Sequence, residues 1–185
     1  MGRIINATGI TAVMSSSIVD NYKMFGLFAL ISGIIATGAS IFGNNMSGVV
    51  LGLALLVVGL LAYAGRIKGK VNIVQFYLII YGIAYIVAGA LQSGFVVILV
   101  FVLIGIIAAL LGFTMYSGKT SSNIWWIILV VVFLLLIVIG FLDLIDTDFG
   151  ELKGIISAIG TIFAVITNVY MLYFMLSNEV KKKFN

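Results

Sequence analysis

The chain has 185 residues, of which 63% are hydrophobic and only 9% are charged, and its formal net charge is +4. A soluble domain is about 45–50% apolar and about 25% charged, so this composition excludes a water-soluble fold and indicates an integral membrane protein. Because histidine and cysteine are both absent, a histidine-dependent triad, a thiolate nucleophile and the usual zinc sites are excluded as well.

Residues 1–23 form an amino-terminal segment that is too polar to span a bilayer. Its apolar residues at positions 4, 5, 10, 13, 14 and 18 loosely follow one helical face. An amphipathic helix on the cytoplasmic membrane surface is one expectation, and a partly disordered tail is the other.

Six apolar segments follow, over residues 24–42, 49–65, 71–92, 95–117, 124–142 and 155–177. At a rise of about 1.5 Å per residue, a helix of about 20 residues covers the hydrocarbon core of about 30 Å. The connections are short, and short connections favour antiparallel neighbours. We therefore predict an all-α transmembrane domain over residues 24–177, a six-helix bundle made of three helical hairpins.

The basic residues follow this segmentation. All but one of the 10 Lys and Arg residues fall on the same predicted side of the membrane. By the positive-inside rule this side is cytoplasmic, so both termini are cytoplasmic and residues 178–185 form a basic cytoplasmic tail. Because topology explains the net charge, no nucleic-acid partner is expected, and a cell membrane is the expected location. These nine residues are Arg3, Lys23, Arg66, Lys68, Lys70, Lys119, Lys181, Lys182 and Lys183.

Small residues at helical spacing predict close-packing seams on four spans, because small side chains let membrane helices approach. The fifth span, "IWWIILVVVFLLLIVIGFL", has a single small residue, Gly140. We expect that helix at the periphery, against lipid or a partner subunit. The predicted seams are Gly26, Ala29, Gly33, Ala36 and Ser40; Gly48, Gly52, Gly59 and Ala62; Gly105, Ala109 and Gly112; and Ser157, Thr161, Ala164 and Asn168.

The third span carries an unusual set of polar side chains. Helical spacing gathers two glutamines and two tyrosines on one side and its flank, and directs Tyr77 elsewhere. Such groups need partners inside a membrane, and the sixth span offers a threonine and an asparagine. The set predicts an interhelical hydrogen-bond network, a narrow cavity for a small neutral solute, or an oligomer contact. Its members are Gln75, Tyr81, Tyr85, Gln92, Thr161 and Asn168.

An acidic loop, "FLDLIDTDFGELK" over residues 141–153, follows the fifth span on the outer side. It is either a solvated tip or a cation site with Asp146, Asp148 and Glu151 as candidate ligands. The spacing does not match a calcium-binding loop, because the third ligand and the closing glutamate are misplaced. No metal and no cofactor is therefore expected.

Three stretches resemble segments of small prokaryotic multipass membrane proteins. The glycine-containing stretch "FGLFALISGIIATGASIFGNNMSGVVLGLALLVVGLLAYAGRIKG" and the short basic inner loops are similar to those of the HdeD-like family. "GFTMYSGKTSSNIWW" and the ending "YMLYFMLSNEVKKKF" also resemble segments of such proteins. The resemblance implies six spans, the plasma membrane of a prokaryote and an association with acid resistance, and it implies no particular site residues.

The charged residues also limit the function. Every Lys, Arg, Asp and Glu lies outside the spans, with Asp143 at an edge, whereas ion-coupled carriers and proton pumps usually need an ionisable group at mid-membrane. We therefore expect a non-enzymatic protein that acts through helix packing and partner contacts, as an accessory subunit of a membrane complex or a stress-related membrane component. A homo-oligomer is another possible arrangement. The alternative function is a small-solute transport component or channel with a polar cavity between spans three and six.

Overall fold

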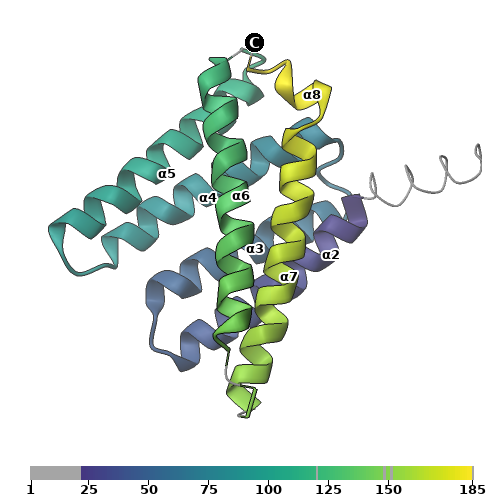
Figure 1. Cartoon of the computed structure of the whole chain (residues 1–185). Helices are drawn as coiled ribbons and strands as arrows, with labels where there is room; N and C mark the ends of the chain where they lie inside the picture. The colour runs from purple at the N-terminus through teal and green to yellow at the C-terminus, as the bar shows by residue number, and fades with distance from the viewer. Residues whose placement is uncertain (1–21, 120, 148, 151, 185) are drawn as a thin grey trace, which may run out of the picture.

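The computed structural model describes residues 22–184 except 120, 148 and 151. This part of the chain is all-helical and contains no strand (Figure 1). Six of its helices are long and apolar enough to cross a membrane, so the predicted number of long apolar helices is confirmed. The amino-terminal helix considered for residues 1–23 lies almost wholly outside the described residues. The helices are α2 (Tyr22–Phe42), α3 (Met46–Tyr63), α4 (Lys70–Ala90), α5 (Phe95–Tyr116), α6 (Asn123–Ile145), α7 (Leu152–Met175) and α8 (Asn178–Lys181).

The acidic connection is shorter than predicted. Helix α6 continues to Ile145 and α7 begins at Leu152, whereas the sequence predicted a loop over residues 141–153. Asp143 therefore lies within α6, and its backbone carbonyl accepts a hydrogen bond of 2.6 Å from the Thr147 hydroxyl. The charge is tolerated because Asp143 is exposed close to the helix end, where a carboxylate can remain in water.

Glycines with positive φ form two of the tight connections. Gly69 has φ 89° and precedes α4, and Gly94 has φ 101° and precedes α5. Residues with a Cβ atom are strained at such angles. Glycine therefore lets the chain reverse direction within a few residues, in a sequence without proline.

The long helices contact one another in the spatial order α5, α4, α3, α2, α7, α6. The closest packing is between α2 and α3, between α4 and α5, and between α6 and α7, and α4 also touches α7 and α8. In contrast, α5 and α6 follow each other in the sequence but make few contacts. In Figure 1 the α4–α5 pair diverges from α6 and α7 toward the end opposite α8.

The backbones of neighbouring helices come into direct contact at glycines. A Cβ atom placed on Gly33 of α2 would lie 2.5 Å from the backbone nitrogen of Leu56 on α3. A Cβ atom on Gly82 of α4 would lie 2.5 Å from the backbone nitrogen of Ala109 on α5. Such distances leave room for hydrogen only, as expected where packing replaces the hydrophobic effect as the force between helices. Close packing is thus present where seams were predicted on the first, second and fourth spans.

The seam predicted on the sixth span is only partly correct. A Cβ atom on Gly160 of α7 would lie 2.6 Å from Cγ2 of Ile35 on α2, and Gly140 of α6 lies against Val165. Ser157, which was predicted to belong to the seam, is exposed. The reason is that α7 packs against α2 on one side and α6 on another, so its contacts divide between two faces.

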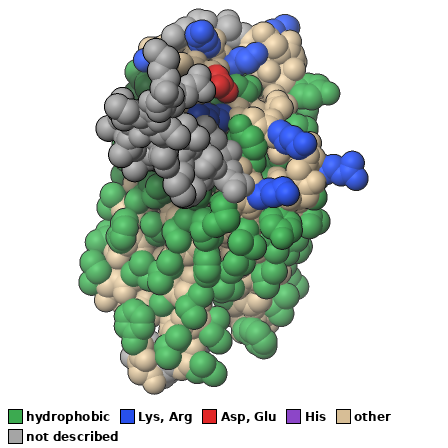
Figure 2. Space-filling model, turned by 90° about the vertical axis from the view of Figure 1, so that its right-hand side faces the viewer, with side chains coloured by type: hydrophobic (Ala, Val, Ile, Leu, Met, Phe, Trp, Pro, Cys, Tyr) green, Lys and Arg blue, Asp and Glu red, His purple; other side chains and the backbone are tan. Residues whose placement is uncertain are grey.

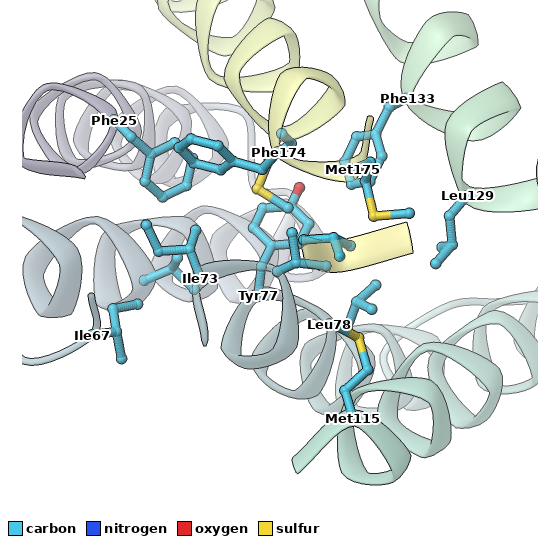
Figure 3. Packing of buried hydrophobic residues seen from close by; sticks show 14 of the residues in the cluster. Phe25, Ile67, Ile73, Tyr77, Leu78, Met115, Leu129, Phe133, Phe174 and Met175 are labelled. Carbon is cyan, nitrogen blue, oxygen red and sulfur yellow. The ribbon is translucent and has the colours of Figure 1, made fainter. Parts of the chain in front are cut away.

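The largest buried side chains cluster near α8, where helices α2, α4, α6 and α7 meet (Figure 3). Phe25 and Phe174 pack edge to face with ring centroids 5.5 Å apart. Val180 and Phe184 are fully buried in the same cluster, and the backbone of Ser121 donates a hydrogen bond of 2.8 Å to the carbonyl of Lys183. The basic segment predicted at 178–185 is thus folded onto the bundle through its apolar residues.

Charged and apolar surfaces are separated along the molecule. Figure 2 shows Lys and Arg side chains gathered toward one end, while hydrophobic side chains cover most of the remaining visible face. Two of the basic side chains contact aromatic rings. The Lys70 Nζ lies 4.9 Å from the ring centroid of Tyr173, and the Lys181 Nζ lies 4.8 Å from that of Trp126. The outer surfaces of the long helices are rich in exposed Ile, Leu, Val and Phe, which suits contact with lipid.

Candidate functional site: a cavity between α4, α5, α6 and α7

A cavity of about 350 Å³ lies where α5 and α6 fail to pack against each other. This volume falls within the range of about 300–1,000 Å³ that is typical of ligand pockets. Most of the lining is apolar, and the polar side chains come from α4 and α7. The lining comprises Leu55 of α3; Tyr77, Leu78, Tyr81 and Tyr85 of α4; Ile104, Ile107, Ala108 and Leu111 of α5; Trp125, Ile128, Leu129, Val132, Phe133 and Leu136 of α6; and Ala164, Thr167 and Asn168 of α7.

Three tyrosines of α4 form one wall of the cavity. Tyr77 and Tyr81 are stacked with ring centroids 4.4 Å apart and planes 15° apart, and Tyr85 follows at 6.3 Å from Tyr81. Their spacing of four residues places them one turn apart on the same face. The prediction that Tyr77 points elsewhere is therefore wrong, because the tyrosine face is centred on positions 77, 81 and 85 rather than on Gln75.

Aromatic side chains of two other helices extend this wall. The ring of Phe133 on α6 lies 5.8 Å from that of Tyr77, and the ring of Phe101 on α5 lies 5.6 Å from that of Tyr85. Centroid distances of about 4.5–7 Å with tilted planes are favourable for aromatic pairs. The tyrosines are consequently held by packing at both ends of the series.

Helix α7 contributes two polar residues to the lining of the cavity. The Thr167 hydroxyl donates to the backbone carbonyl of Phe163 at 2.8 Å, so its donor is already used. The partly buried Asn168 side chain makes no hydrogen bond within the described residues, and neither does the Tyr85 hydroxyl. A polar group in an apolar membrane cavity is costly without a partner, so these two residues offer hydrogen bonds to whatever occupies the space.

The structure brings Tyr81, Tyr85 and Asn168 together at the cavity, and it places the other predicted members of the set elsewhere. Gln75 is buried near one end of α4, where its backbone carbonyl faces Gly112 of α5. Gln92 is at the opposite end, and its side-chain amide donates to the Ser47 hydroxyl at 2.7 Å. Thr161 lies on α7 beside Gly140 of α6. Gln75 is six residues and Gln92 is eleven residues from Tyr81 along the chain, so the two glutamines lie at different heights along the bundle and do not join one site with it.

Sequence reasoning did not select Tyr77, Thr167 or Trp125 for the site, although all three line the cavity. The signal for Tyr77 was present, because the spacing 77, 81, 85 repeats every four residues along one helical face. Trp125 belongs to the span that was predicted to lie at the periphery, and its contact with the cavity depends on the tertiary position of α6.

The carboxylates of the acidic connection are only partly described. Asp146 is exposed and directly follows α6, where its backbone N–H donates to the carbonyl of Leu142. Asp148 and Glu151 lie outside the described residues, so the cation site predicted from these three residues stays a prediction. Among the described residues no group of three or more metal-ligating side chains is present.

Some of the residues that line the cavity are exposed on the outer surfaces of α5 and α6. Its rim residues Ile104 of α5 and Ile128 of α6 are 46% and 42% exposed, and these surfaces belong to helices of membrane-spanning length. Toward the basic end the buried Leu78 and Met115 belong to the core cluster that closes the bundle (Figure 3). Because none of its lining residues carries a formal charge, the cavity is suited to neutral molecules.

Comparison with known protein families, with curated proteins and with solved structures finds no match. The similarity to HdeD-like proteins therefore stays a prediction from the quoted stretches. The class of protein rests on the fold itself: six long apolar helices with apolar outer surfaces define a multipass membrane protein.

Proposed function

We propose that this chain is a non-enzymatic multipass protein of a prokaryotic plasma membrane that acts through contacts with a membrane partner. The observation that carries this proposal is the exposure of α6. Among its described residues only Leu129, Phe133 and Gly140 are buried, and α7 is its one extensive neighbour. An apolar helix held mainly on one side offers a long surface to a second membrane helix, as in an accessory subunit or a stress-related component.

The proposed topology has three helical hairpins with both termini in the cytoplasm. Close contacts between α2 and α3, α4 and α5, and α6 and α7 support the pairing. Arg66, Lys68 and Lys119 come from different connections at the end of the bundle where α8 packs. Basic residues remain preferentially on the cytoplasmic side of a membrane, which supports the orientation.

A small-solute transport component is the second candidate. It is favoured by the presence of Tyr81, Tyr85 and Asn168 around one cavity. The absence of any charged lining residue argues for a neutral solute and against ion coupling. The two roles use different surfaces, because partners would bind the outside of α6 and solutes would bind inside the bundle.

The native mass of the protein, released gently from its own membrane, tests the proposal. Other chains bound at constant ratio support the accessory role, and they should be lost when Leu135 and Ile139 on the exposed part of α6 are replaced by serine. The matched control replaces Leu99 and Leu103, on the exposed part of α5, by serine in the same way. A protomer with no bound chain in several mild detergents and in nanodiscs would contradict it.

A further inference from the structure

We infer that the cavity binds a neutral, flat-ringed amphiphile that enters from the bilayer between α5 and α6. This ligand class is distinct from the proposed membrane partner of α6. Binding would use the inner side of α4 and α7, whereas the partner would use the outer side of α6, so an experiment can fail for one and succeed for the other.

The aromatic lining indicates a ring. Tyr77, Tyr81, Tyr85, Trp125 and Phe133 all border the cavity, and the stacked pair Tyr77–Tyr81 provides an ordered aromatic wall. Flat rings pack favourably against such side chains in offset or edge-to-face arrangements. A saturated chain would gain contact area from these rings but no such preference.

The polar lining indicates a carbonyl or hydroxyl group on that ring. Neither the Tyr85 hydroxyl nor the Asn168 amide is hydrogen-bonded within the described residues. Both groups can donate and accept, and a neutral oxygen substituent can bond to either of them. A charged head group would find no counter-charge in the lining and would pay the cost of desolvation.

The position of the opening indicates the bilayer as the source. The rim residues Ile107 and Val132, on α5 and α6, are 39% and 42% exposed on surfaces that suit contact with lipid. Toward α8 the bundle is closed by buried apolar side chains such as Leu78 and Met115. An amphiphile already dissolved in the membrane can reach the cavity without crossing water, and its apolar tail can remain in lipid.

The two tryptophans of the chain allow a direct test. Trp125 lines the cavity, and Trp126 instead donates a hydrogen bond of 2.8 Å to the carbonyl of Met175. Decyl-benzoquinone, which quenches tryptophan fluorescence, is titrated into the full-length protein in nanodiscs. We expect saturable quenching in the unmodified protein and loss of the saturable part in Trp125→Phe.

Two further variants test the hydrogen-bonding groups. Tyr85→Phe and Asn168→Leu should each lower the affinity for the probe about tenfold, as expected for one lost hydrogen bond in an apolar site. Tyr116→Phe is the matched control, because Tyr116 is 67% exposed at the end of α5. The affinity of this variant for the probe should not change. Unchanged helical ellipticity and elution volume verify folding, and Tyr85→Phe, which removes one oxygen, retains the test if Asn168→Leu misfolds.

Three results would overturn the inference. The first is quenching that rises linearly with probe concentration in the unmodified protein. The second is an equal saturable signal in Trp125→Phe, which would place the probe elsewhere. The third is reversal of the saturable quenching by decyl alcohol at a concentration equal to that of the quinone. Such a result would indicate a groove for alkyl chains without preference for a ring.

Discussion

Tyr77 and Tyr81 stack almost parallel, with ring centroids 4.4 Å apart and planes 15° apart. The two residues are one turn apart on α4, and Phe133 of α6 packs against the ring of Tyr77 with centroids 5.8 Å apart. This arrangement connects α6 to α4 through aromatic contact, whereas the one extensive neighbour of α6 is α7. The ring of Tyr77 is therefore expected to matter more for stability than its hydroxyl group.

Replacing Tyr77 tests this expectation. Tyr77→Phe retains the ring and should leave the thermal unfolding midpoint nearly unchanged, whereas Tyr77→Leu should lower the stability by about 1 kcal/mol through loss of the aromatic pairs. Unfolding in a mild detergent, followed by helical ellipticity, measures both. If Tyr77→Phe were as damaging as Tyr77→Leu, a hydrogen-bond network through the hydroxyl would be the correct explanation.

Two glycines of α2 provide a matched pair for the close approach of helices. A Cβ atom on Gly33 would collide with the backbone of Leu56 at 2.5 Å, whereas one on Gly38 would meet nothing within 4 Å. Gly33→Ala should therefore destabilise the protein by about 1–3 kcal/mol, because the two backbones must separate. Gly38→Ala should be neutral or stabilising by up to about 1 kcal/mol, since alanine is the better helix former.

The measurement is the same detergent unfolding experiment, with both variants expressed and purified in parallel. Equal stability of Gly33→Ala and Gly38→Ala would show that α2 and α3 are separated enough to admit a methyl group. It would also contradict the interpretation of the small-residue seam as a site of close packing.

The helices could be predicted from the sequence because length and apolarity alone define a membrane span. The glycine seams on α2, α3 and α5 could also be predicted, because each of these helices uses its glycines against one close neighbour. On α7 the same reasoning was only partly correct, since Gly160 faces α2 while Val165 faces α6. A pattern on one helix does not tell how many neighbours that helix has.

The candidate site could be predicted only in part for the same reason. Tyr81, Tyr85 and Asn168 were selected as polar groups at helical spacing, and they line one cavity. Gln92 was selected by the same rule and bonds instead to Ser47 on α3. Polarity indicates that a group needs a partner, but only the tertiary arrangement decides which partner it finds. The gap between α5 and α6 has no signature in either helix.

Phe184 lies close to the end of the chain and yet is fully buried in the core cluster. We expect Phe184→Ala to lower the stability by about 3 kcal/mol, the lower end of the range for a buried phenylalanine. The matched control is Phe42→Ala, because Phe42 is 89% exposed at the end of α2. A loss for Phe184→Ala no greater than for Phe42→Ala would mean that the end of the chain does not pack as described. Protease digestion provides a second measurement, since an undocked segment should be cut faster.

Thr37 of α2 carries a buried hydroxyl that has no hydrogen-bond partner within the described residues. Replacement by valine, which has nearly the same shape, removes the cost of the unpaired group and should raise the stability by about 1 kcal/mol. Thr167→Val is the control, because the Thr167 hydroxyl is bonded to the carbonyl of Phe163 and its removal should give no gain. A lower unfolding midpoint for Thr37→Val than for the unmodified protein would indicate a bond that the hydroxyl makes in the membrane.

The proposed orientation can be tested with two serines at the two ends of α5. Ser93 precedes this helix and Ser117 follows it, and both are exposed. The chain has no cysteine, so Ser93→Cys and Ser117→Cys each introduce a single reactive thiol by a conservative change. Because Ser117 is next to the basic connection with Lys119, it should face the cytoplasm by the positive-inside rule.

A membrane-impermeant maleimide added to intact cells should therefore label Ser93→Cys and leave Ser117→Cys unlabelled until the cells are opened. Labelling of both variants after opening shows that each thiol is reactive, which removes poor accessibility as an explanation. The reverse pattern would place the basic end outside and both termini with it, against the charge distribution. Labelling of both in intact cells would mean that α5 does not cross the membrane, and the six-span topology would then have to be abandoned.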